Sequence, residues 1–174
     1  MKWTAIFALV FLIIVSCKPA EVEGQVKEAK ATIADTTSIR IVSFSTDPVN
    51  NLFHFDSTAT GWTGTLYRYQ VGANNVANIT DIRTMVPKND WLEFNDFVGF
   101  LKIFEIPDQK DLTDFTPQPN PKNVRIQFEL NRKGKTRMYV YDNPAAKPGS
   151  HWTTDNINTF ISYITQDFNF VQPN

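Results

Sequence analysis

The chain has 174 residues and a single cysteine, Cys17, which limits how the fold can be stabilised. Because no second cysteine is present, an internal disulfide is excluded. The residues after Cys17 therefore need a hydrophobic core. A chain of this length buries on the order of two thirds of the surface that its unfolded form exposes, and this is enough for one domain.

Cys17 stands at the end of an apolar run that begins the chain. Lys2 is followed by eleven uninterrupted apolar residues, 5–15. A positive start and an apolar run of this length are typical of a secretory signal peptide, and the run is too short to span a membrane as a helix, which takes about 20 residues. The following Ile-Val-Ser-Cys, residues 14–17, resembles the lipobox of bacterial lipoproteins, with isoleucine where leucine is usual.

This resemblance implies that Cys17 is lipidated and that cleavage before it removes a signal peptide, residues 1–16. Several acyl chains, each buried CH₂ contributing about 0.8 kcal/mol, give stable membrane attachment. The implied location is the cell envelope, with the outer membrane favoured over the inner one, and the membrane is the first expected partner. The alternative is a plain signal peptide or N-terminal anchor in which Cys17 has no role.

Residues 17–36 are predicted to be a lipidated tether, followed by one domain at 37–174. The tether is charged and contains no aromatic residue; as a flexible coil it would span roughly 25 Å, although its Ala, Glu and Lys also favour helix. The whole chain has 17 basic and 18 acidic residues. It thus lacks the basic excess of a nucleic-acid-binding protein, and no nucleic-acid partner is expected.

The domain sequence alternates between strand and helix patterns. Alternating or β-branched segments predict strands at 38–45, 52–56, 65–71, 124–130 and 135–141, and less regularly within 76–86. Between the fourth and fifth of the firmer segments, Gly134 is available for the positive φ of a hairpin turn. Residues 61–64, with two glycines, indicate a break in the chain.

Two helices are predicted by apolar residues at helical spacing. Asp90 can cap the first, with Glu93 three residues later as in a capping box; the second is predicted to begin at Thr153 or Thr154. Their apolar stripes are Trp91, Phe94, Phe97, Val98, Leu101 and Phe104 in the first helix, and Ile157, Phe160, Ile161, Ile164 and Phe168 in the second. Since each helix has one stripe to bury, the predicted fold is α+β, an antiparallel sheet with two amphipathic helices packed on one face. This layout is similar to that of small lipoproteins of Bacteroidota.

No catalytic constellation is apparent in the sequence. The strand–GxSxG–helix motif is absent, and His54 and His151 are the only histidines that could act as a base. His54 and Asp56 form an HxD pair, but two ligands do not make a metal site. We therefore predict no enzyme activity, no cofactor and no metal.

Two groups of residues are candidates for ligand binding. His151 and Trp152 precede a predicted helix, where free N–H groups favour anions; alternatively, Trp152 packs on the helix as a hydrophobic staple. Tyr67, Tyr69, Tyr139 and Tyr141 would form an exposed platform, flanked by Arg68 and Arg137, if both pairs share the uncovered face of the sheet. Such surfaces suit protein or glycan contacts, but strand tyrosines more often pack in the core or against each other.

The resulting prediction is an envelope-tethered, non-enzymatic binding or structural domain with a protein or glycan partner. One alternative is an envelope hydrolase with a site near His151, Asp155 or Asp56. Another is a periplasmic immunity or inhibitor protein.

Overall fold

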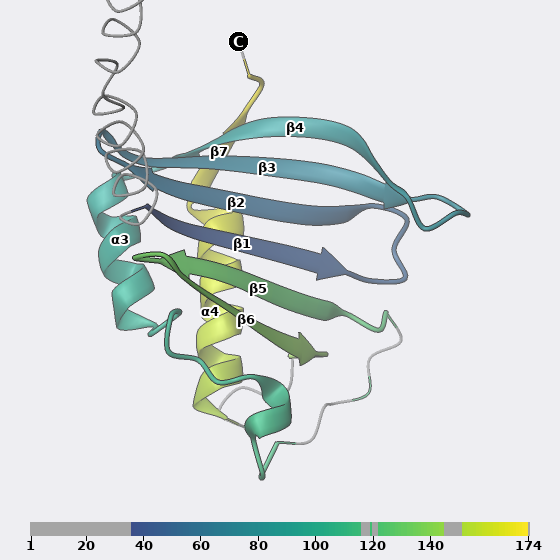
Figure 1. Ribbon diagram of the computed structural model, residues 1–174. Helices are drawn as coiled ribbons and strands as arrows, with labels where there is room; N and C mark the ends of the chain where they lie inside the picture. The colour runs from purple at the N-terminus through teal and green to yellow at the C-terminus, as the bar shows by residue number, and fades with distance from the viewer. Residues whose placement is uncertain (1–35, 116–118, 120–121, 145–150, 174) are drawn as a thin grey trace, which may run out of the picture. The chain divides into compact units, whose positions relative to one another are not determined.

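The computed structural model describes residues 36–115, 119, 122–144 and 151–173. The predicted signal peptide and, except for Thr36, the predicted tether lie outside these residues. The described part forms one seven-stranded antiparallel sheet with two helices (Figure 1), which confirms the predicted α+β class. No helix in it is both long and apolar enough to cross a membrane.

The strand order across the sheet is β6-β5-β1-β2-β3-β4-β7, with each neighbouring pair antiparallel. The strands are β1 (Thr37–Phe44), β2 (Asn50–Thr58), β3 (Gly61–Val71), β4 (Ala77–Pro87), β5 (Arg125–Arg132), β6 (Lys135–Asp142) and β7 (Phe168–Val171). The helices are α3 (Trp91–Phe100), α4 (Trp152–Gln166) and a short 3-10 helix, η1 (Gln109–Asp111).

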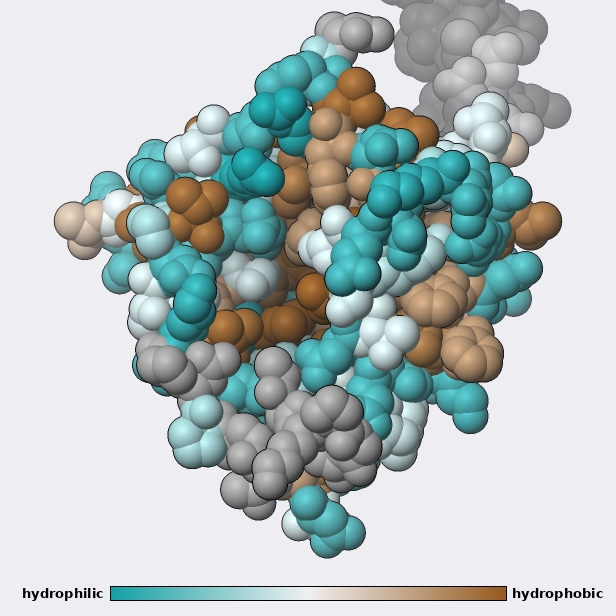
Figure 2. Space-filling view, turned by 180° about the vertical axis from the view of Figure 1, so that it is seen from behind, coloured by the Kyte–Doolittle hydropathy of each residue, from teal (hydrophilic) through white to brown (hydrophobic). Residues whose placement is uncertain are grey.

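The core lies between the sheet and the two helices, which both cover the same face, behind the sheet in Figure 1. Side chains alternate along a strand, so Ile39 and Ile41 of β1 face the helices together. Rings from both layers meet there: Phe55 lies 4.7 Å from Phe94 of α3, between ring centroids, and Phe128 lies 6.4 Å from Phe160 of α4. The helix-bearing side is shown in Figure 2, where hydrophilic residues surround a hollow with a hydrophobic floor.

The N-terminus of α3 is capped as predicted. The Asp90 side chain accepts a hydrogen bond of 2.7 Å from the backbone N–H of Glu93, satisfying one of the amides that a helix leaves free at its start. The helix ends at Phe100, so Phe104, predicted to extend its stripe, lies beyond it. The chain still packs there, because Leu101, Ile103 and Ile106 are all buried in the core.

The β5–β6 hairpin also follows the prediction. Lys133 and Gly134 form its two-residue turn with φ of 52° and 70°. Two such positive φ values match the right-handed twist of the flanking strands.

Three local predictions were wrong. Residues 61–64 do not break the chain but begin β3. A glycine stands at position 64 of this strand because the Trp91 ring fills the space of a side chain, 3.1 Å from an ideal Cβ. The cap of α4 is His151 instead of Thr153 or Thr154. Phe168 does not continue α4: it begins β7, which pairs with Thr84–Pro87 of β4.

Candidate functional site

The sheet face opposite α3 and α4, here called the open face, is not covered by any described helix (Figure 1). Its central row runs across three strands: Val42 of β1 pairs with Leu52 of β2, which pairs with Tyr67 of β3. Ile82 of β4 continues this row and is exposed. The open face is therefore hydrophobic along its middle, although solvent reaches it.

An apolar groove of about 350 Å³ lies on this face. Its lining residues come from β1 to β4: Arg40, Val42, Phe44, Leu52, Tyr67, Tyr69, Ala77 and Ile79. Two of their polar groups are already bonded within the protein. The Arg40 guanidinium lies 2.5 Å from the Glu129 carboxylate, and the Tyr69 hydroxyl donates to the Ser43 carbonyl at 3.2 Å.

Burial also raises the pKa of Tyr69 above its ordinary value. With the Arg40 guanidinium and the Tyr69 hydroxyl engaged, the groove offers mainly aliphatic and aromatic contact.

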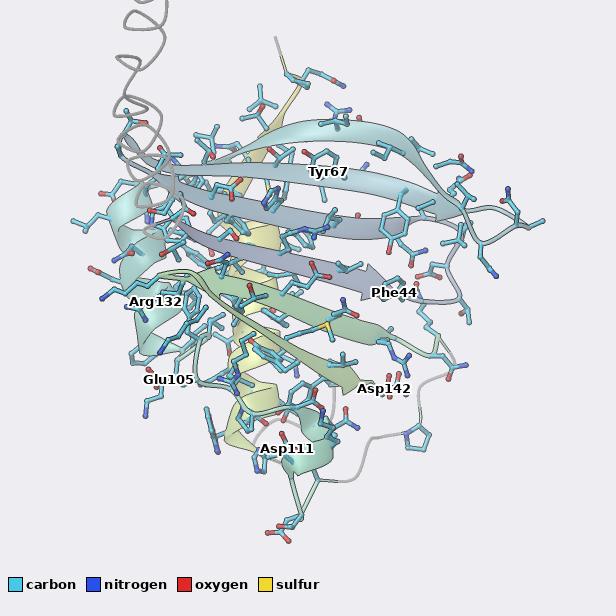
Figure 3. The ribbon with its side chains drawn as sticks, viewed as in Figure 1. Phe44, Tyr67, Glu105, Asp111, Arg132 and Asp142 are labelled. Carbon is cyan, nitrogen blue, oxygen red and sulfur yellow. The ribbon has the colours of Figure 1, made fainter. Side chains whose placement is uncertain are left out.

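A second hollow of about 790 Å³, here called the polar pocket, adjoins the groove at Phe44. It is lined by Phe44, Ser45, Thr46, Asn123, Val124, Arg125, Gln127, Asp142 and Asn143. Figure 3 labels Phe44 at the end of β1 and Asp142 at the end of β6, at the same end of the sheet. Between them lies Arg125, which pairs with Phe44 on one side and with Asp142 on the other.

An ion pair forms one wall of the polar pocket. Arg125 donates from Nε to Asp142 Oδ1 at 2.6 Å and from Nη2 to Asp142 Oδ2 at 3.2 Å. The hydrogen bond and the charge of Asp142 raise the pKa of Arg125. The pair is partly exposed, so its contribution to stability is small. Its chemical importance is that a donor and an acceptor are fixed side by side.

The loops at the polar pocket are held by backbone hydrogen bonds. The Thr46 N–H donates to the Lys122 carbonyl at 2.9 Å, and the Asn143 N–H donates to the Val124 carbonyl at 2.6 Å. Asn123 and Asn143 have φ of 45° and 48°, a region that asparagine adopts more readily than most residues. The pocket is thus formed before any ligand arrives.

The predicted platform of four tyrosines does not form. Tyr67 and Tyr69 lie on the open face, but Tyr139 and Tyr141 lie on the helix-bearing face and are 0% exposed. Tyr139 pairs with Phe128 across β5 and β6, and the two rings stack in the core at 4.7 Å. The condition for the platform, that both pairs share the uncovered face, is not met, and Tyr139 and Tyr141 pack in the core, as the alternative had it. Both faces of the sheet carry apolar residues, so alternation alone does not say which face is covered.

The buried tyrosines have structural partners. The Tyr139 hydroxyl donates to the Ile103 carbonyl and the Tyr141 hydroxyl to the Pro107 carbonyl, each at 3.0 Å. Burial raises the pKa of Tyr139 well above its usual value. Arg137, predicted to flank the platform, instead donates to the carbonyls of Phe104 and Ile106.

His151 and Trp152 form the start of α4. The His151 ring accepts from the Thr153 N–H at 3.4 Å, so this amide is already engaged by the protein. Trp152 is the first helical residue, 48% exposed, and its ring stacks near His151 at 6.3 Å between centroids. It therefore does not precede the cap, as a hydrophobic staple would.

On the open face, His54 Nε2 lies 3.2 Å from Asp56 Oδ2. Among the residues that the structure describes, no group of three or more His, Cys, Asp or Glu side chains is placed to hold a metal ion.

Comparison of the chain with protein-family models, with curated proteins and with solved structures gave no match. Sequence reasoning missed Phe44, Arg125 and Asp142, because they come from three strands and only the cross-strand register brings them together.

Proposed function

We propose that this protein is a lipid-anchored, non-enzymatic binding domain of the bacterial cell envelope, which takes a protein or glycan ligand on its open face. The observation that carries the proposal is the apolar groove on a sheet face that no described helix covers. Contiguous apolar surface of this kind marks interaction sites in soluble domains.

The groove suits binding because its walls are rigid. Its side chains stand on four hydrogen-bonded strands, and Phe44 packs edge-on against Tyr69 with ring centroids 6.4 Å apart. A preformed groove loses little conformational entropy when a ligand binds. A ligand that presents aliphatic or aromatic groups would gain affinity by covering Leu52 and Tyr67.

The positions of the two histidines support binding over hydrolysis. His151 caps α4, and His54 lies at the surface beside the Asp56 carboxylate. A general base needs an orienting partner and a nearby nucleophile or water site in a cleft. An immunity or inhibitor protein would use the same kind of apolar surface, so one experiment tests both forms of binding.

The lipobox resemblance supports the location. A lipid on Cys17 would hold the domain at the membrane, connected by residues 18–36. Ligands of the groove would then be envelope components within reach of that tether.

The test is photo-cross-linking in the cells that make the protein, with a photoreactive phenylalanine at position 67. We expect a discrete cross-linked species that disappears in the Leu52→Asp background. Leu92→Asp is the matched control, because Leu92 is exposed on α3, on the other side of the sheet. Circular dichroism confirms that each variant is folded. If the species persists in a folded Leu52→Asp variant, the groove is not the binding surface.

A further inference from the structure

We propose that the polar pocket is a subsite for a neutral sugar, in which Phe44 stacks on the ring and the Arg125–Asp142 pair binds adjacent hydroxyls. The inference rests on the proposed function, since it names the ligand class taken at one end of the open face. Nothing about it depends on the histidines or on the anchor.

The first argument is the juxtaposition of an aromatic ring and polar groups. Phe44, Arg125 and Asp142 stand in one cross-strand row, where neighbouring Cβ atoms are about 4.5–5.5 Å apart. Phe44 is 37% exposed, and its edge-on contact with Tyr69 fixes the ring while leaving part of it accessible. A sugar ring has an apolar face for such a surface and hydroxyls along its edge.

The second argument is the balance of donors and acceptors. A guanidinium has five N–H donors and a carboxylate about four acceptor positions, so the two hydrogen bonds between Arg125 and Asp142 leave several of each unused. A hydroxyl both donates and accepts. Two adjacent hydroxyls can therefore accept from Arg125 and donate to Asp142, while the exposed side-chain amide of Asn123 offers one more donor group and one more acceptor.

The third argument is charge. The lining holds one guanidinium and one carboxylate, joined by a hydrogen bond of 2.6 Å, so the lining carries no net charge. A phosphate or uronate would be attracted by Arg125 but repelled by Asp142, and a cation would be attracted by Asp142 but repelled by Arg125. An acyl chain would cover these polar groups without hydrogen-bonding them, which is costly. A neutral polyol is the ligand class that meets all three conditions.

The test uses the full-length protein in dodecylphosphocholine micelles, a detergent without a sugar headgroup. Cellohexaose, maltohexaose and mannohexaose are each added to about 10 mM, a concentration that detects millimolar binding, and backbone amide shifts are followed by NMR. We expect at least one of them to shift the amides of Phe44, Arg125 and Asn143. Triglucuronic acid serves as the anionic probe and should shift them less.

Two variants make the result specific. Phe44→Ala should weaken binding about tenfold or more, whereas Met138→Ala, an exposed open-face residue of β6 outside the pocket, should leave it unchanged. If Phe44→Ala does not fold, Asp142→Asn takes its place and should weaken binding to a similar degree. The inference is overturned if none of the three hexasaccharides shifts these amides, if the folded pocket variant binds as well as wild type, or if only the anionic probe binds.

Failure of this inference and failure of the proposed function are distinguishable. If no hexasaccharide binds but the cross-link at position 67 still depends on Leu52, the sugar subsite is wrong and the binding function stands. If a hexasaccharide binds through Phe44 while the cross-linked species persists in the Leu52→Asp variant, the sugar subsite stands and the groove is not the binding surface.

Discussion

The hydroxyl of Tyr139 donates a hydrogen bond of 3.0 Å to the carbonyl of Ile103, and both residues are 0% exposed. Tyr139→Phe keeps the ring but leaves the carbonyl buried without this donor. We expect the free energy of unfolding to fall by about 1–3 kcal/mol, as measured by urea denaturation. Tyr67→Phe, at a half-exposed position of the open face, is the control and should change it by less than about 0.5 kcal/mol. Equal effects of the two substitutions would contradict the assigned role of the Tyr139 hydroxyl.

Gly64 and Gly99 offer a matched pair of glycine-to-alanine substitutions. An ideal Cβ at Gly64 would lie 3.1 Å from atoms of Met85, Phe55 and Trp91, whereas one at Gly99 meets nothing within 4 Å. We expect Gly64→Ala to lower the melting temperature, with a loss of about 1–3 kcal/mol from overpacking. Gly99→Ala lies within α3 and should stabilise by about 0.5–1 kcal/mol. A stabilising Gly64→Ala would show that Trp91 does not pack on this position.

Stability should fall in alkali. Burial, reinforced by Glu93, Asp167 and Asp90, raises the pKa of Tyr163 to about 12. The unfolded chain ionises this phenol at its ordinary pKa of 10.0, so unfolding becomes easier as the pH rises from 10 to 12, and below pH 10 the group has no effect. Urea denaturation from pH 8 to 12 checks this range. Tyr163→Phe should make the decline shallower, and an unchanged slope would contradict the assignment.

The anchor can be tested separately from the domain. Cys17→Ser should abolish incorporation of labelled palmitate, and the protein should then either leave the membrane fraction or keep its leader. Ser16→Ala, which preserves a small residue before the cysteine, should be processed normally. A Cys17→Ser protein that is still labelled would refute lipidation at this residue.

Local patterns in the sequence predicted most of the elements. Alternation over 124–130 gave β5 with Ile126, Phe128 and Leu130 buried together, and the Asp90 cap gave the start of α3. These features depend on residues within a few positions of one another. The fold class followed because each helix has one stripe to bury.

The candidate site could not be predicted in the same way. Which face of β6 is covered depends on where α4 lies, so the sequence left open whether Tyr139 and Tyr141 lie on a surface or in the core, where the structure places them. Phe44, Arg125 and Asp142 become neighbours only through the register of three strands. Neither relationship can be predicted from a short window of sequence, because each depends on residues far apart in the chain.

The pairing of β1 with β5 has a consequence for how the protein is made. Arg40 and Glu129 meet across these strands although they are 89 residues apart in the chain. Strands β1 to β4 can pair with their neighbours in sequence, but the β1 side of the sheet cannot be completed until β5 has been synthesised. Topologies with such distant pairings fold slowly. Until then Ile39 and Ile41 have no partners on that side, and the edge of β1 can pair with another chain. A factor that covers the β1 edge during synthesis would prevent such pairing, and aggregation of the unfinished chain is the cost of this topology.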